Sequence, residues 1–84
     1  MKNSGNEIND MQGLVESMLA VSQDSTVYKR IAAYVEKYYM KIIFMTAEEM
    51  ADALSVSQGS VSKFCIALGY RGYADFLRSL QKLV

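Results

Sequence analysis

The segment from residue 46 to residue 69 most constrains the fold, because it holds two short amphipathic patterns separated by only about three residues. The first pattern opens on the sequence TAEE at residues 46–49, a capping box in which the threonine hydroxyl and the second glutamate satisfy amides at a helix start. The inward residues that follow recur at helical spacing: Met50, Ala51 and Leu54. We therefore expect a helix of about two turns that ends near Ser55.

The second pattern predicts another helix, with Ser57 as its N-cap. Its inner stripe consists of Val61, Phe64, Cys65 and Leu68. Gly69 follows the last apolar residue, as a left-handed C-terminal cap requires. Two short helices joined by a tight turn have the layout of a helix-turn-helix. Ala51 is small where two such helices would cross closely, and Val56 and Val61 would fill the angle between them.

Three more helices are expected around this unit. The first, capped by Asn6, has apolar residues at Ile8, Met11, Leu14, Val15, Met18 and Leu19. A loop at residues 22–25 precedes the second, whose stripe is Val27, Ile31, Tyr34, Val35 and Tyr38. The last carries Phe76, Leu77, Leu80 and Leu83. The fold class is thus all-α: one homeodomain-like bundle of about five helices over residues 1–84, with the helix-turn-helix at about 46–69.

Two segments between these helices have less decisive patterns. Residues 40–45 are apolar enough for a short strand, an extended loop or the tail of the preceding helix, and we assign them to a connector. Residues 70–73 form a second connector.

Composition excludes several classes of protein. The 84 residues are 51% hydrophobic and 21% charged, as in a globular domain, but so short a chain has a marginal core that dimerisation would support. One cysteine and no histidine leave neither an internal disulfide nor a zinc cluster, so we expect no metal and no cofactor. The chain shows no signal peptide and no apolar run long enough for a membrane span. We expect a cytoplasmic protein that does not contact a membrane.

The net charge is zero, but the charges are unevenly distributed along the chain. Residues 1–24 carry one basic and four acidic residues, which gives 1 − 4 = −3, whereas residues 57–84 carry four basic and one acidic, which gives 4 − 1 = +3. The basic C-terminal third is compatible with an anionic partner.

The outward face of the second helix of this unit is rich in small polar side chains. Its first turns present serines with Gln58, Gly59 and Lys63, and a reading helix that must come close to DNA needs short side chains there. Serine hydroxyls and the free amides of the helix end favour phosphate oxygens. Gln58 can read adenine through two hydrogen bonds, and Lys63 can reach guanine or a phosphate.

The same serines also fit other interpretations. A solvated helix face fits the serines alone, but the capped helix before them and the small and branched residues at the crossing favour the helix-turn-helix. A flexible linker would not keep Val56, Val61 and Phe64 in helical register. Residues 60–63 match the serine–lysine pattern S-x-x-K, but its companion motifs are missing. Cys65 has no histidine to activate it, so we predict a packing thiol and no enzymatic activity.

The stretch from about Asp24 to Leu80 resembles the N-terminal DNA-binding domain of RpiR-type bacterial transcriptional regulators. The resemblance is carried by VYKRIAAYV and by MTAEEMADALSVSQGSVSKFCIALGYRGYADFL. The chain departs from the family at Ser60, where threonine is usual, at Lys63, where arginine is common, and at Ser55, where the turn usually has glycine. A serine at positive φ would cost about 1 kcal/mol, and lysine lacks the bidentate fork of arginine.

The resemblance implies double-stranded DNA as the partner, a homodimer, and control of sugar or carbohydrate metabolism genes. We expect nine DNA-binding residues: Thr46, Ser57, Gln58, Gly59, Ser60, Ser62, Lys63, Arg71 and Tyr73. Family members normally continue into a sugar-isomerase-like domain that binds a phosphosugar effector, and these 84 residues do not contain it. The alternative function is a helical protein-interaction module that keeps the fold without binding DNA.

Overall fold

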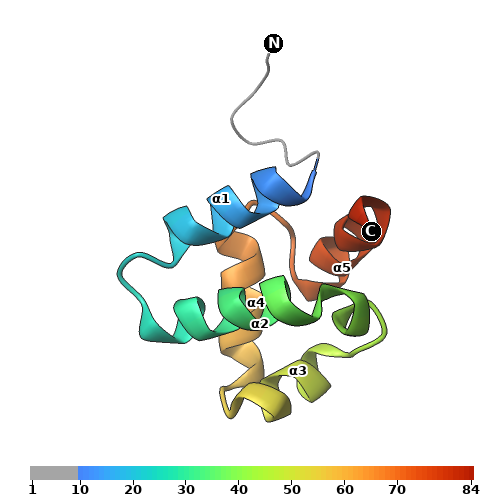
Figure 1. Cartoon of the computed structure of the whole chain (residues 1–84). Helices are drawn as coiled ribbons and strands as arrows, with labels where there is room; N and C mark the ends of the chain where they lie inside the picture. Colours follow the sequence, from blue (N-terminus) through green and yellow to red (C-terminus); the bar gives the residue numbers. More distant parts are fainter. Residues whose placement is uncertain (1–9) are drawn as a thin grey trace.

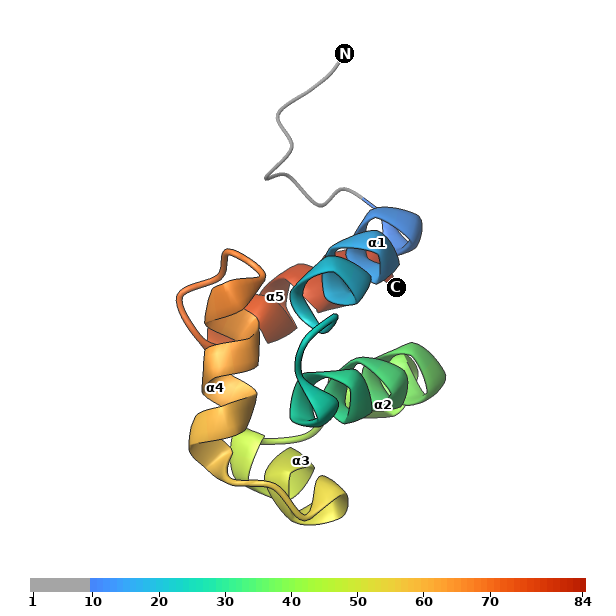
Figure 2. The same cartoon turned by 90° about the vertical axis from the view of Figure 1, so that its left-hand side faces the viewer.

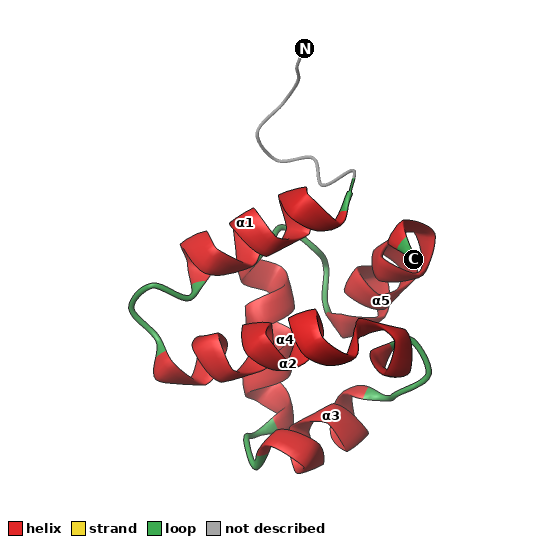
Figure 3. Cartoon of the chain, viewed as in Figure 1, coloured by secondary structure: helices red, strands yellow, loops and turns green. Residues whose placement is uncertain are grey.

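The computed structural model describes residues 10–84, and every regular element among them is a helix (Figure 3). The helices are α1 (Met11–Val21), α2 (Thr26–Ile42), α3 (Ala47–Leu54), α4 (Gln58–Ala67) and α5 (Tyr73–Leu83). The all-α prediction is confirmed. Within the described residues, no helix is both long and apolar enough to cross a membrane.

The long helix α2 lies at the centre of the bundle. In Figure 1, α1 lies above α2, α3 lies below it and α4 crosses behind it. In Figure 2, α4 stands beside α2 and approaches α3 at its lower end, while α5 packs against α4. This arrangement leaves the side of α4 that faces away from α2 uncovered by any other helix of residues 10–84.

The core is built from all five helices. Its largest fully buried side chains include Leu14, Met18, Ile31, Val35, Phe64 and Phe76. Tyr28 of α2 meets Phe64 of α4 edge to face, with ring centroids 5.5 Å apart. The apolar stripe of α1 therefore packs into the core of its own domain.

The start of α1 differs from the sequence prediction. The predicted cap Asn6 and the predicted stripe residue Ile8 lie outside the described residues. Helix α1 begins at Met11, and its N-cap is Asp10, whose carboxylate accepts a hydrogen bond from the Gly13 amide at 2.7 Å. Apolar periodicity does not locate a helix start, because several polar residues in succession can act as the cap.

The connector prediction for residues 40–45 was wrong for its first half, because α2 continues to Ile42. Ile42 lies seven residues after Val35, on the same helix face, and is completely buried. Tyr38, which we predicted on the inner stripe, has non-helical dihedral angles (φ −123°, ψ 29°) and is exposed. Its ring lies 5.5 Å from the Lys37 ammonium and 5.8 Å from that of Lys41. Packing of Ile42 thus extends the helix past a local kink.

Candidate nucleic-acid interface

The start of α3 is fixed by the predicted capping box. The Thr46 hydroxyl accepts from the Glu49 amide at 3.0 Å, and the Glu49 carboxylate accepts from the Thr46 amide at 2.9 Å. Thr46 is exposed at this helix end. Its hydroxyl already accepts the capping hydrogen bond, and its O–H donor remains available for an external acceptor.

The turn after α3 is left-handed at Ser55, the position at which the resemblance would place glycine. Ser55 has φ 57° and ψ 43° and is the single non-glycine residue with positive φ in the described part of the chain. The Val56 amide donates to the Ala51 carbonyl at 3.0 Å, which closes the helix end. Arg30 of α2 donates to the Leu54 carbonyl, so α2 also holds the turn in place.

Helices α3 and α4 are in contact, and the residues predicted at their crossing pack in or against the core. Ala51 is 3% exposed and Val61 is fully buried, while Val56 is partly buried in the turn between them. Cys65 lies in the same core, and burial raises the pKa of its thiol to about 12. The thiol is therefore protonated near neutral pH, which fits its predicted role in packing.

The N-terminus of α4 is organised by a pair of serines. The Ser57 hydroxyl accepts from the Ser60 amide at 3.0 Å, and the two hydroxyl oxygens lie 2.8 Å apart in a further hydrogen bond. Each hydroxyl has one proton, and their mutual bond uses only one of the two. The pair therefore caps the helix and still keeps one O–H donor for an external acceptor, such as a phosphate oxygen.

The outward face of α4 brings most of the predicted site residues together. Gln58, Gly59 and Lys63 are exposed and Ser62 is partly exposed, whereas the inner stripe is buried. Among residues 10–84, the one ion pair joins Arg78 and Asp75, so no carboxylate of this segment pairs with the Lys63 ammonium. This face thus presents a cation, an amide side chain and the positive end of a helix.

Sequence reasoning missed one residue of this face. Ile66 has 56% of its surface exposed and lies three residues after Lys63 and seven after Gly59. At about 100° per residue, these three share one stripe. The signal was present in the sequence: the inner stripe of α4 was already assigned, and Ile66 does not belong to it.

The last two predicted site residues lie at the start of α5. Arg71 is exposed, and its amide donates to the Asp75 carboxylate at 3.0 Å. Tyr73 is the first residue of α5 and not part of a connector, and it is only 8% exposed. Its hydroxyl donates to the Met45 carbonyl at 2.8 Å and lies 3.4 Å from that of Ile42. Tyr73 joins α5 to the segment before α3, and we omit it from the proposed DNA contacts.

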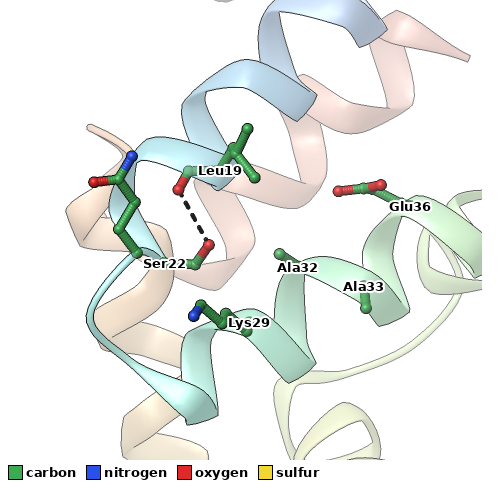
Figure 4. Close-up of a pocket in the computed structure, with 7 residues that line it drawn as sticks. Leu19, Ser22, Lys29, Ala32, Ala33 and Glu36 are labelled. Atoms are coloured by element: carbon green, nitrogen blue, oxygen red, sulfur yellow. Dashed lines mark hydrogen bonds between the residues drawn. The ribbon is translucent and has the colours of Figure 1, made fainter.

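A surface pocket of about 300 Å³ lies between α1, the turn after it and α2 (Figure 4). Its labelled lining residues are Leu19, Ser22, Lys29, Ala32, Ala33 and Glu36. Ser22 has the most buried polar side chain of the pocket. Its hydroxyl donates to the Leu19 carbonyl at 3.2 Å, so its donor is already used within the chain. No residue of α3 or α4 lines this pocket, so it is separate from the outward face of α4.

Comparison with known proteins agrees with this geometry. Residues 13–83 match the family model described as "Helix-turn-helix domain, rpiR family". No curated protein and no solved structure gave a significant match to the chain. The family match covers α1 from its third residue and all of the other four helices, including the capped α3, the left-handed turn and the serine-capped α4. The chain therefore belongs to the rpiR family of helix-turn-helix domains, the DNA-binding domains of transcriptional regulators.

Proposed function

We propose that this domain binds specific sequences of double-stranded DNA and inserts α4 into the major groove, with its N-terminal turn closest to the bases. The observation that carries the proposal is the outward face of α4, which is exposed, close to the left-handed turn and free of acidic residues over Gln58–Ala67. Membership of the rpiR family supports DNA binding by a regulator. The proposal adds which residues read the bases.

Each residue of this face has a role that follows from its chemistry. Gln58 can donate to and accept from adenine, and Lys63 can donate to guanine or to a phosphate. Gly59 has no side chain to hold the helix away from the groove. The Ser57–Ser60 pair and the first amides of α4 suit a phosphate, because they combine a free O–H with unpaired N–H groups.

Three residues at the rim complete the proposed interface: Thr46 and Arg71 are exposed and Ser62 is partly exposed. Thr46 lies at the N-terminus of α3, where its O–H and the helix end favour a backbone phosphate. Ser62 and Arg71 flank the reading face at its centre and beyond its C-terminal end, and both side chains donate hydrogen bonds. Such contacts set the position of the domain on the duplex and carry no base information themselves.

The wider biological role is also a proposal. We infer a bacterial, cytoplasmic regulator of sugar or carbohydrate metabolism genes from the family alone. A homodimer would match the two-fold symmetry of typical operators. In α1, Leu14 and Met18 are not available for a dimer contact, because both are fully buried in the domain itself. Leu19, with 64% of its surface exposed, is the apolar side chain of α1 that remains for such a contact.

Two substitutions test the reading-face assignment. Gln58→Ala and Lys63→Ala should each weaken binding to a preferred duplex by about 1–3 kcal/mol, measured by fluorescence anisotropy. Gln12→Ala on α1 and Lys82→Ala on α5 are matched controls, because both residues are exposed and distant in the chain from α4. Unchanged affinity for both reading-face variants, with an intact circular dichroism spectrum, would refute the assignment.

A protein-interaction module is the second candidate function. The observation that favours it is the weak charge of the interface: Lys63 is the single basic residue of α4, and the net charge of the chain is zero. Phosphate binding normally relies on several lysines or arginines. If the domain shows no affinity for any duplex even at low salt, the interaction module becomes the better account.

A further inference from the structure

An exposed isoleucine lies on the proposed reading face without an assigned role. Ile66 has 56% of its surface exposed, although it belongs to α4, whose other large apolar residues are buried. A single exposed apolar side chain needs no explanation by itself. The position of Ile66 does need an explanation, because this residue continues the outward stripe that already contains Gly59 and Lys63.

The spacing of this stripe is that of a reading helix. Gly59, Lys63 and Ile66 stand at positions i, i+4 and i+7, three of the positions by which the reading helix of a homeodomain meets base edges. Ile66 lies about 4.5 Å further along the helix axis than Lys63. Successive bases of one strand are about 3.4 Å apart, so the two side chains address neighbouring base pairs.

The chemistry of isoleucine restricts what Ile66 can recognise. Its side chain neither donates nor accepts a hydrogen bond, so it gains nothing from the polar edges of guanine, cytosine or adenine. The apolar group that base edges offer in the major groove is the C5-methyl of thymine. Burying that methyl against Ile66 removes apolar surface of both partners from water.

We propose that Ile66 is a specificity-determining residue that contacts a thymine methyl next to the base pair addressed by Lys63. The inference rests on the proposed function, because it requires α4 in the major groove. It deepens that function by assigning the C-terminal half of the reading face to apolar readout of thymine, beside the polar readout by Gln58 and Lys63.

The test compares thymine with deoxyuridine, which differs only by the absence of the C5-methyl. A preferred duplex is first selected from randomised DNA, and each thymine is then replaced singly by deoxyuridine. Dissociation constants are measured for the native chain, for Ile66→Ala and for Met40→Ala. The last variant is the matched control, because Met40, with 60% of its surface exposed, is similar to Ile66 in exposure but lies on α2.

The expected result is one thymine whose replacement weakens binding of the native chain and of Met40→Ala by about fourfold, the value of one buried methyl group. The same replacement should leave the affinity of Ile66→Ala unchanged. Because Ile66 is exposed and alanine favours helix, the variant should unfold at the native temperature or above it.

Two results would overturn the inference, and they are distinguishable from failure of the proposed function. If a preferred duplex is found but Ile66→Ala and the native chain respond identically to every deoxyuridine, Ile66 does not read a methyl. The inference also fails if no thymine of the preferred duplex can be replaced by deoxyuridine with a loss of affinity for the native chain. If no sequence is enriched, the proposed function fails and this inference fails with it.

Discussion

Replacing Ser55 with glycine removes the Cβ atom from the left-handed turn between α3 and α4. This conformation is unfavourable by about 1–2 kcal/mol for a residue with a Cβ, but not for glycine. Glycine also increases the conformational entropy of the unfolded chain, which lowers the free energy of unfolding by about 0.4–1 kcal/mol. Ser55 is exposed, so little packing is lost. The free energy of unfolding should therefore rise by about 0.5–1 kcal/mol, or about 2–8 °C in Tm for a domain of this size.

Urea denaturation followed by circular dichroism measures this change, and two glycines provide matched comparisons. Gly69→Ala should lower the free energy of unfolding by about 1–2 kcal/mol, because φ is +106°, a conformation that is unfavourable for any residue with a Cβ. No atom lies within 4 Å of the new Cβ, so no steric clash adds to this conformational cost. Gly59→Ala should raise the free energy of unfolding by about 0.5–1 kcal/mol, because alanine is more favourable than glycine inside a helix. The new Cβ would make only a van der Waals contact, 3.9 Å from the Ser57 hydroxyl oxygen. A Ser55→Gly chain no more stable than the native one, with Gly69→Ala neutral, would refute the strain argument.

Three further predictions concern the core. Ala51→Leu should lower the free energy of unfolding by about 1–3 kcal/mol in urea denaturation, because the crossing of α3 and α4 has no room for the extra atoms; a fully stable variant would contradict this. Tyr73→Phe should cost about 1–3 kcal/mol by leaving the Met45 carbonyl without its donor, and no loss would show that the bond is dispensable. Burial raises the pKa of Cys65 and of Tyr73 to about 12 from ordinary values of 9.0 and 10.0, so both stay protonated in the folded chain while the unfolded chain ionises. Stability should therefore be complete below pH 9 and fall between about pH 9 and 12, and a flat profile there would be inconsistent with that burial.

The helix-turn-helix was predictable from sequence because several local signals agree within 24 residues. The capping box at Thr46, the N-cap at Ser57 and the glycine at Gly69 each mark a helix end by short-range hydrogen bonding. The small residue Ala51 then indicated how closely the two helices approach. All these features depend on contacts within a few residues, which the sequence displays directly.

Other features depended on contacts between distant residues. The burial of Tyr73 follows from its hydrogen bond to the Met45 carbonyl, 28 residues earlier, and no local pattern indicates it. Ile42 extends α2 because the core accepts its side chain, although the chain around it looked like a connector. Tyr38 showed that an aromatic residue at helical spacing can still face solvent.

Selection of binding sites from randomised duplex DNA, followed by a salt titration on the best site, shows whether α4 reads a specific DNA sequence. We expect a palindromic consensus with half-sites about 10 base pairs apart, or a multiple of that. We also expect log affinity to fall linearly with log salt, with a slope of about −0.9 for each phosphate contacted. No enrichment at low salt, for the chain alone and for a chain forced to dimerise, would contradict the assignment of α4 as a DNA-reading helix.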